Sequence, residues 1–299
     1  MNVHTSERSP SGPETRPGET EFLAAYNPRE FPSPAVTVDI CVFTIRDGLL
    51  QVLLVERADH PYKGFWAIPG GFVNAGNDQG SPGGSEDPDD AALRELGEET
   101  GLDPFPGHLE QLRTFGRPGR DPRTRVISIA YVAFAPDLPD PVAGSDATRA
   151  RFWPVTDLDL DRAAGDETVG LAFDHREIIT AALERVRSKI EYTTLAAEFL
   201  TEPFTLPDLR RVYTAVWGFD LDAANFSRKV RSIGGFVVEV PRDQTGAPDG
   251  TGGQWPGAAQ RKPAVGRPAM LYTRGTAAEL CPPLTRPKDT DEPETDPEP

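Results

Sequence analysis

Five apolar, β-branched runs recur between residues 35 and 160, and they constrain the fold more than any other feature of the chain. Several of these runs are apolar on both faces, which is typical of a sheet covered on both sides. One short helical pattern, DPDDAALRELGEET, interrupts them, and a longer one follows over residues 174–190. We therefore expect an α/β (α+β) unit. Its predicted strands are AVTVDICVFTI, LLQVLLVER, FWAIPGGFV, RVISIAYVAF and RARFWPV.

Composition divides the 299 residues into four segments. Both ends are rich in Pro, Thr and acidic residues, which predicts disorder. Two folded units lie between them, and each contains a Gly-rich insert. The predicted segments are a disordered N-terminus 1–34, a first domain 35–190 with an insert at about 74–85, a second domain 191–275 with an insert at 241–268, and a disordered acidic tail 276–299.

Membrane and secretion signals are missing from the sequence. The longest apolar run, near AVTVDICVF, is far below the roughly 20 residues that a membrane span needs. The first 20 residues have no apolar core, so they do not form a signal peptide. The two cysteines, Cys41 and Cys281, lie far apart and lack metal-ligand spacing. We expect reduced thiols in a cytoplasmic protein without a membrane partner, with Cys41 in a strand core.

The second unit reads as a winged helix-turn-helix. TLPDLRRVYTAVWG begins with a box-like cap, Thr205 with Asp208, and Gly218 ends it. DAANFSRKVRSIGG follows, and Asp222 is its predicted cap. Two strand-like pieces, GFVVEV and AMLYTR, come next. Helix, helix, basic helix and hairpin is the order of a winged helix-turn-helix. The predicted inward residues are Leu209, Val212, Tyr213, Val216 and Trp217, then Phe226, Val230 and Ile233.

Charge sets this second unit apart from the rest of the chain. The net charge is −16, yet residues 203–275 hold 10 basic and 6 acidic residues, a net of +4. Such sign asymmetry is informative about partners. The basic helix could read or clamp DNA, or it could be a solvated face of a degenerate module. Arg267 could reach a minor groove, or it could be a solvated loop charge. The predicted outward residues of the basic helix are Asn225, Arg228, Lys229, Arg231 and Ser232.

The stretch RELGEETGL raises a separate question, because it places Glu95, Glu98 and Glu99 on one face of a helix. Like charges at this spacing repel unless a cation neutralises them. Carboxylates are the ligands of hard divalent cations such as Mg²⁺. Arg94 can pair with Glu98, and Glu86 could complete the cluster. The alternative is a solvated helix face. We expect Asp87 to cap this helix, Pro88 and Gly101 to bound it, and Leu93 and Leu96 to face the sheet.

These residues resemble the Nudix box, G-x5-E-x7-R-E-U-x-E-E-x-G-U with U aliphatic. From Glu86 to Leu102 the match is complete, whereas Gly71 lies 15 residues before Glu86 instead of 6. Gly80 has the literal spacing, but Gly71 is the natural equivalent, with nine residues inserted. The resemblance implies the Nudix fold, a mixed-sheet α/β/α sandwich, followed here by the winged helix. It also implies that Glu95, Glu98, Glu99 and, more weakly, Glu86 bind Mg²⁺ or Mn²⁺, that one carboxylate doubles as a base, and that Arg94 supports them.

A longer resemblance covers roughly residues 35–275, apart from the two inserts. FGRPGRDPRTRVISIAYVAF, LAFDHREII and EYTTLAAEFLTEPFTLPDLRRVYTAVWG resemble the Nudix-related transcriptional regulators of NAD metabolism. These join a Nudix domain to a C-terminal winged helix and sense ADP-ribose or related NAD derivatives. Many members have lost the catalytic acids and only bind. The acids remain here, which favours retained hydrolysis.

Other residues near these motifs have two interpretations each. Arg120 or Arg123, in FGRPGRDPRTR, could hold a diphosphate, or Asp121 and Arg123 could only fix the turn. Phe65 and Trp66 could stack on an adenine, although core packing is the commoner use. His175 could touch a ligand or be a structural histidine.

Three functions follow from these motifs. The first is a Mg²⁺-dependent Nudix hydrolase that cleaves ADP-ribose or a similar nucleotide to AMP and a sugar phosphate and carries a DNA-binding domain. The second is a non-hydrolytic repressor, a homodimer whose pocket binds ADP-ribose and changes the spacing of two winged helices. The third is a hydrolase whose winged helix only dimerises. The complete box favours the first function over the second, and the basic segment favours both over the third.

Overall fold

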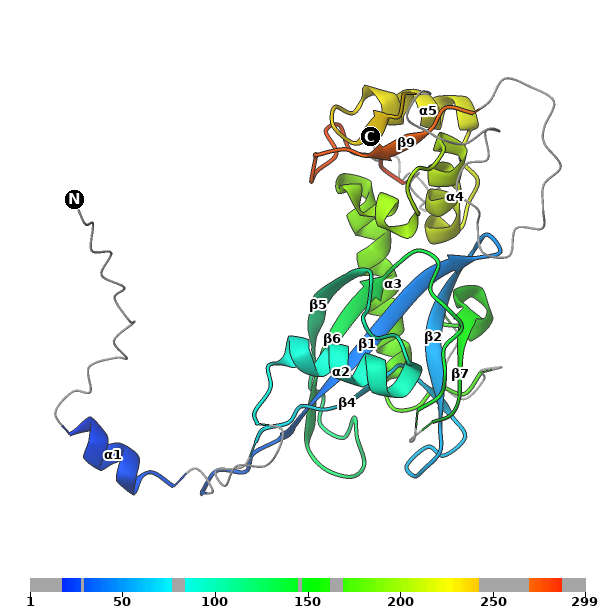
Figure 1. Cartoon of the computed structure of the whole chain (residues 1–299). Coiled ribbons are helices and arrows are strands. Elements are labelled where there is room, and N and C mark those ends of the chain that lie inside the picture. Colours follow the sequence, from blue (N-terminus) through cyan, green and yellow to red (C-terminus); the bar gives the residue numbers. More distant parts are fainter. Residues whose placement is uncertain are drawn as a thin grey trace, which may run out of the picture. The chain divides into compact units, whose positions relative to one another are not determined.

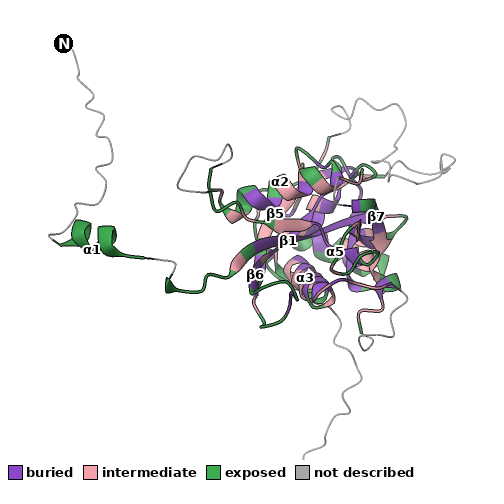
Figure 2. Ribbon diagram, turned by 90° about the horizontal axis from the view of Figure 1, so that it is seen from below, coloured by how far each residue is buried: buried purple, intermediate pink, exposed green. Residues whose placement is uncertain are grey.

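A computed structural model describes residues 18–27, 30–76, 84–144, 147–161, 169–241 and 269–286. The chain divides into two compact units, residues 1–34 and 35–299. In the first unit, α1 (Glu19–Ala25) has no buried residue (Figure 2). The expectation of disorder throughout 1–34 is wrong for this helix. Its sequence, ETEFLAA, contains good helix formers and acidic residues in the first turn, where they favour the helix dipole.

A seven-stranded mixed sheet is the centre of the second unit (Figure 1). Its main path runs β3-β2-β1-β6-β5, and two further strands join it, β4 beside β1 and β7 beside β2. β1 and β6 are parallel, and the other pairs are antiparallel. The strands are β1 (Ala35–Arg46), β2 (Leu49–Arg57), β3 (Trp66–Ala67), β4 (Gly70–Phe72), β5 (His108–Phe115), β6 (Val126–Phe134) and β7 (Ala147–Pro154).

Helices cover both faces of this sheet, as the two-sided apolar runs predict. Alternate residues of a strand point to opposite faces. On β1, Val38, Ile40 and Val42 lie in the core beneath α2 (Pro88–Thr100). Cys41 and Phe43 lie in the core that α3 (His175–Tyr192) covers. The prediction of an α/β/α arrangement, with Cys41 in a strand core, is confirmed.

The predicted strands agree with the observed ones except in two places. FWAIPGGFV is two short strands, β3 and β4, because Ile68 and Pro69 separate them. β5 was missed, since HLEQLRTF is polar and all but two of its residues, Leu112 and Phe115, are partly or fully exposed. The short 3-10 helix η2 (Val155–Leu158) follows β7. None of the helices within the described ranges is long and apolar enough to span a bilayer.

The winged-helix elements follow α3 in the predicted order: η3 (Thr194–Phe199), α4 (Leu206–Trp217), α5 (Ala223–Ser232), β8 (Val237–Glu239) and β9 (Tyr272–Arg274). Thr205 and Asp208 form the predicted capping box, and Gly218 ends α4 in the left-handed conformation. Asp222 accepts a hydrogen bond from the Asn225 amide, 2.7 Å. The eight predicted inward residues are all buried. Residues 242–268 of the wing insert, and with them Arg267, lie outside the described part of the chain.

One hydrophobic core joins α3 to α4 and α5. Tyr213 donates from its hydroxyl to the Ile190 carbonyl, 3.0 Å, and Trp217 donates from its indole to the Arg187 carbonyl, 3.1 Å. Arg187 in turn donates to the Val216 carbonyl, 3.1 Å. The packed winged helix therefore sits directly on the C-terminal half of α3.

Residues 275–286, which we call the C-terminal strap, also hold this junction together. Leu280 and Leu284 are each 4% exposed, and their amides donate to carbonyls at the end of α3, both at 2.8 Å. Arg286 bonds Glu184 and Glu191 of α3 at 2.6 and 2.5 Å. The expectation of a disordered tail from residue 276 is therefore wrong up to residue 286. Acidic composition predicted disorder, but two leucines within that stretch are enough to anchor it.

Candidate functional sites

The acidic helix α2 forms where the sequence predicts it, although its buried face differs. It begins after Asp87 with Pro88 at the first position, and Gly101 ends it with a left-handed φ of 72°. Asp87 makes no side-chain capping bond. Leu96 is fully buried, but Leu93 is 44% exposed, so the expectation that Leu93 faces the sheet is wrong. Three residues on a helix turn by about 300°, and the small side chains of Ala91 and Ala92 occupy the sheet side instead.

Arg94 is the hub of the carboxylate cluster. Its guanidinium donates to both oxygens of Glu86, at 2.6 and 3.0 Å. It also donates to Glu95 at 2.8 Å and to Glu98 at 3.0 Å, and the latter is the predicted i,i+4 pair. A further bond, 3.1 Å, goes to the Phe72 carbonyl and ties the hub to β4. The structure therefore brings together Arg94 and three of the four predicted carboxylates.

Glu86 keeps its place in the cluster despite the insertion before it. Ala75 and Ser85 form an antiparallel bridge across the neck of the insert. The Glu86 amide donates to the Asn74 carbonyl at 3.0 Å, and the Asn74 amide donates to the Glu86 carboxylate at 2.8 Å. Residues 77–83, including Gly80, lie outside the described residues. Closure of the neck explains how a longer loop still delivers Glu86 to Arg94.

The double glycine of β4 lets the carboxylates of Glu95 and Glu99 approach the backbone. A Cβ at Gly71 would lie 2.2 Å from a Glu95 oxygen, so a side chain there would displace the Glu95 carboxylate. The Gly70 amide donates to Glu99 at 2.9 Å. Burial raises the pKa of Glu95 above its usual value, although the Arg94 charge opposes this shift. Gly71, placed by sequence as the Nudix-box glycine, thus lies against the acidic helix.

The cluster suits a hard divalent cation in its chemistry and charge. Three carboxylates bond one guanidinium, so negative charge remains after Arg94 is counted, and all the candidate ligand atoms are oxygens. Within the described residues, however, no three His, Cys, Asp or Glu side chains gather as a metal-binding group. Glu98 is the most available carboxylate, with 60% of its side chain exposed, against 12% for Glu95. Binding of a cation would require these side chains to turn away from Arg94.

The two candidate residues of the arginine-rich loop, Arg120 and Arg123, lie in different environments. Arg120 is buried, with 4% of its side chain exposed, and it bonds Asp174 at 2.7 Å and Asp39 at 3.2 Å. Arg123 is 44% exposed and bonds the buried Asp121 at 2.7 Å. The turn-fixing bond between Asp121 and Arg123 is therefore present. Arg120 anchors the loop to β1 and to the start of α3, whereas Arg123 remains open to solvent.

For His175 and Trp66 the structure favours a structural role over ligand contact, whereas Phe65 is exposed. His175 is buried, its Nδ1 accepts from the Ile68 amide at 3.0 Å, and burial lowers its pKa. Trp66 is buried, while Phe65 is 43% exposed. His175 thus fixes the strand before Gly70, and only Phe65 is accessible.

The sequence reading missed a second arginine beside Arg123. Arg57, at the end of β2, lies with its guanidinium 5.0 Å from the Phe173 ring centroid, and Arg123 lies 5.7 Å from the same ring. Burial and then the Arg123 charge lower the pKa of Arg57, whereas the Glu99 charge opposes them. Within the described chain no carboxylate lies within 4 Å of Arg57, whose Nε donates to the Pro61 carbonyl at 2.8 Å. Two guanidiniums therefore lie beside the Phe173 ring, and one of them, Arg57, is influenced by the charge of Glu99.

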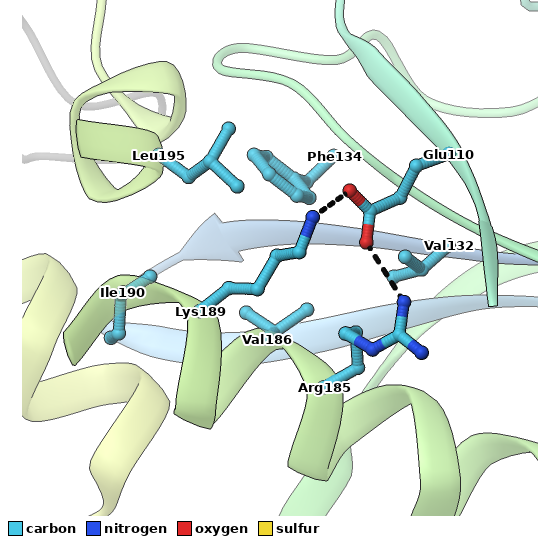
Figure 3. A pocket seen from close by; sticks show the side chains of 8 residues that line it. All are labelled: Glu110, Val132, Phe134, Arg185, Val186, Lys189, Ile190 and Leu195. Carbon is cyan, nitrogen blue, oxygen red and sulfur yellow. Dashed lines mark hydrogen bonds and ion pairs between the residues drawn. The ribbon is translucent and has the colours of Figure 1, made fainter. Parts of the chain in front are cut away.

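A hollow on the opposite face of the sheet is not part of this site (Figure 3). Its apolar lining includes Val132, Phe134 and Val186, and Lys189 and Arg185 pair with Glu110 at its edge. Burial raises the pKa of Glu110, but hydrogen bonds from His108 and Lys189 outweigh it and lower the pKa to about 2. Because its charged groups pair with one another, the hollow is a packing contact between β5 and α3 rather than a ligand site.

The outward face of α5 carries a group of exposed cations. Arg228, Lys229 and Arg231 are exposed, and no carboxylate of the described residues lies within 4 Å of them. Arg228 bonds Asn225 at 2.8 Å, and Arg231 bonds the Tyr272 hydroxyl at 3.3 Å. By contrast, Arg211 and Arg274 nearby are paired with acidic residues. The three cations on α5 are therefore available to phosphates.

Comparisons with known proteins match both domains. Residues 34–172 match the NUDIX domain, and residues 196–248 match the NrtR DNA-binding winged helix domain. The ADPR responsive transcriptional repressor NtrR of Acinetobacter baylyi is 32% identical over 256 residues, 85% of this chain and 87% of the relative. The ADP-ribose pyrophosphatase of Methanocaldococcus jannaschii is 36% identical over 152 residues, 49% of this chain and 71% of the relative.

A solved structure also spans both domains. The crystal structure of Shewanella oneidensis NrtR complexed with a 27mer DNA is 28% identical and aligns with a TM-score of 0.56. The alignment covers 80% of this chain and 93% of that chain. Together with the matched domains, this extent shows that the chain belongs to the Nudix-related transcriptional regulators, which join a NUDIX domain to an NrtR-type winged helix.

Proposed function

We propose that this chain regulates transcription in NAD metabolism, and that its Nudix domain binds and hydrolyses ADP-ribose or a related nucleoside diphosphate derivative. The two curated relatives support this proposal, one as an ADPR responsive repressor and the other as an ADP-ribose pyrophosphatase. We assign residues 35–190 to ligand binding and 191–275 to DNA binding. A homodimer remains a prediction that sedimentation velocity tests.

Retention of every acid of the Nudix box is the observation that carries the hydrolytic function. Glu95, Glu98 and Glu99, with Glu86, would hold Mg²⁺ or Mn²⁺. Bound there, the cation would withdraw charge from the diphosphate and supply an activated water. Glu98 is the most exposed of the acids paired with Arg94, so we assign it the base or water-positioning role. The products would be AMP and a sugar phosphate.

The diphosphate would lie between the acidic helix and the two neighbouring guanidiniums. Arg57 and Arg123 lie 5.0 and 5.7 Å from the Phe173 ring centroid, and an anion bound by both would relieve the repulsion between their like charges. Arginine also suits bidentate phosphate recognition. Arg120 is paired and buried, so we assign it the role of positioning the loop that carries Arg123. Gly71 would allow the backbone to approach the ligand.

A non-catalytic sensor is the second candidate, and the Arg94 hub favours it. Arg94 already bonds three carboxylates and offsets part of their charge, which lowers the demand for a metal ion. In that case ADP-ribose would bind, control DNA affinity and persist unchanged.

Incubation of the purified chain with ADP-ribose and Mg²⁺ or Mn²⁺ separates the two candidates. The hydrolase produces AMP, which chromatography detects, and the reaction stops when the metal is chelated. A chain that binds ADP-ribose in calorimetry but yields no AMP with either metal is a sensor only.

A further inference from the structure

An aromatic cluster lies beside the two guanidiniums, in the loop between β2 and β3. The Tyr62 ring centroid lies 4.7 Å from that of Phe173 and 5.8 Å from that of Phe65. The loop is closed by the Gly64 amide, which donates to the Arg57 carbonyl at 2.9 Å, and by the Phe65 amide, which donates to the Tyr62 carbonyl at 3.0 Å. Closure of the loop holds Tyr62 against Phe173, which comes from the start of α3.

These rings are too exposed for simple core packing. Tyr62 is 36% exposed and Phe65 is 43% exposed. Aromatic side chains dominate cores because they bury a large area, and that stabilisation is only partly realised here. Their open faces are available to another flat group.

The backbone at both members of the closest pair is strained. Tyr62 has a φ of 61° and Phe173 a φ of 52°, in the left-handed region that bulky residues seldom occupy. Strain of this kind concentrates at ligand clamps and active sites, where the surrounding structure imposes it. Two strained aromatic residues from separate segments, with their rings in contact, therefore mark a binding surface.

Charge places this surface next to the diphosphate position. Phe173 has Arg57 over its ring at 5.0 Å, and Arg123 lies between Phe173 and Phe72 at 5.7 and 5.5 Å. Phe72 in turn accepts a hydrogen bond from Arg94. Rings, guanidiniums and carboxylates thus form a continuous series. The order matches a nucleotide, in which a flat base is joined through ribose to a diphosphate.

We infer that Tyr62 and Phe173 form the nucleobase subsite, with Tyr62 stacking on the purine of the nucleoside diphosphate. This inference rests on the proposed function and adds the residue that distinguishes a nucleotide from a bare diphosphate. Stacking needs only the face of the ring, so the Tyr62 hydroxyl is not required.

Substitution of Tyr62 by Gly tests the contribution of the ring to binding separately from its contribution to the fold. Glycine accepts a φ of 61° without strain, so Tyr62→Gly removes the ring without adding backbone strain, and circular dichroism should show an unchanged fold. The full chain is titrated by calorimetry, with Mg²⁺, against two non-hydrolysable ligands. One is α,β-methylene-ADP, and the other is methylenediphosphonate, which has the charge but no base.

The expected result is selective. Tyr62→Gly should raise the Kd for α,β-methylene-ADP about 5- to 150-fold, the range for loss of one base–aromatic stack, and leave that for methylenediphosphonate unchanged. Tyr62→Phe should bind both ligands as the wild type does. Arg57→Gln should weaken both ligands, because it acts on the shared diphosphate.

Each other outcome has a distinct meaning. Equal nucleotide affinity in Tyr62→Gly and wild type overturns the stacking inference and leaves the proposed function intact. Equal weakening of both ligands by Tyr62→Gly shows that the loop, rather than the stack, matters, and also overturns it. A wild-type chain that binds neither ligand refutes the proposed nucleotide binding and the subsite together.

Discussion

At the scale of single residues, two arginines that each bond several carboxylates have opposite environments. Arg94 is partly exposed and bonds three carboxylates that could serve other partners. Arg120 is buried and bonds two carboxylates that are themselves buried. A partly exposed pair is weakened by solvent and exchanges partners readily, whereas a buried one is costly to break. Arg94 can thus take part in the chemistry of the site, whereas Arg120 stabilises the structure around it.

The first prediction at this scale concerns Glu98. Glu98→Gln keeps the size of the side chain and removes one negative charge, so turnover of ADP-ribose should fall by about 10²–10⁴-fold, the usual contribution of a positioned base. Helix content should not change, because one of several like charges has been removed. Steady-state AMP release measures the effect. Asp90→Asn, an exposed acid on the first turn of the same helix, is the matched control and should retain activity.

The second prediction concerns Arg120. Arg120→Met leaves Asp39 and Asp174 buried without their cation, and loss of one partner of a buried pair typically costs about 3–5 kcal/mol. Urea denaturation should show this loss in the free energy of unfolding. Arg117→Met is the control, because Arg117 is 69% exposed, and it should change stability by less than about 0.5 kcal/mol. Similar losses in both variants would contradict the buried role of Arg120.

At the scale of elements, the sequence predicted what local signals specify. Gly101 and Gly218 end their helices, and Thr205 and Asp208 form their capping box, because these motifs act within a few residues. β5 was missed because an edge strand needs little apolar surface. The Arg57–Phe173 contact was missed for a different reason. It joins the end of β2 to the start of α3, and no local pattern reports which distant residues a sheet brings together.

The third prediction concerns α5. Arg228→Glu with Arg231→Glu should abolish binding to the promoter DNA of the chain's own gene, because phosphate neutralisation supplies much of the affinity. Binding of ADP-ribose should be unaffected. A mobility-shift assay at several salt concentrations measures the DNA affinity. The control is Arg149→Glu with Arg151→Glu on β7, an equal charge change in the Nudix domain. DNA binding that survives the α5 change, or that is insensitive to salt, would exclude this helix.

At the scale of the whole molecule, the C-terminal strap makes stability depend on residues beyond the winged helix. The fourth prediction is that a stop after Gly275 lowers the midpoint of thermal unfolding by about 4 °C or more, because two buried leucines are lost. Each contributes about 1.5–3 kcal/mol before the entropy of ordering the strap is subtracted. A stop after Arg286 keeps the strap and is the control. Equal midpoints for the two shortened chains would show that the strap adds nothing.

α3 connects the ligand site to the winged helix, and its length has a mechanical consequence (Figure 1). Phe173 and Asp174 at its start touch the arginines of the ligand site, while Arg187 and Ile190 near its end bond the winged helix. Its 18 residues span about 27 Å at 1.5 Å per residue. A rigid rod of that length acts as a lever. A tilt of about 5° at the ligand end would displace the other end by about 2 Å. The helix α5, which belongs to the same hydrophobic core as that end, would move with it.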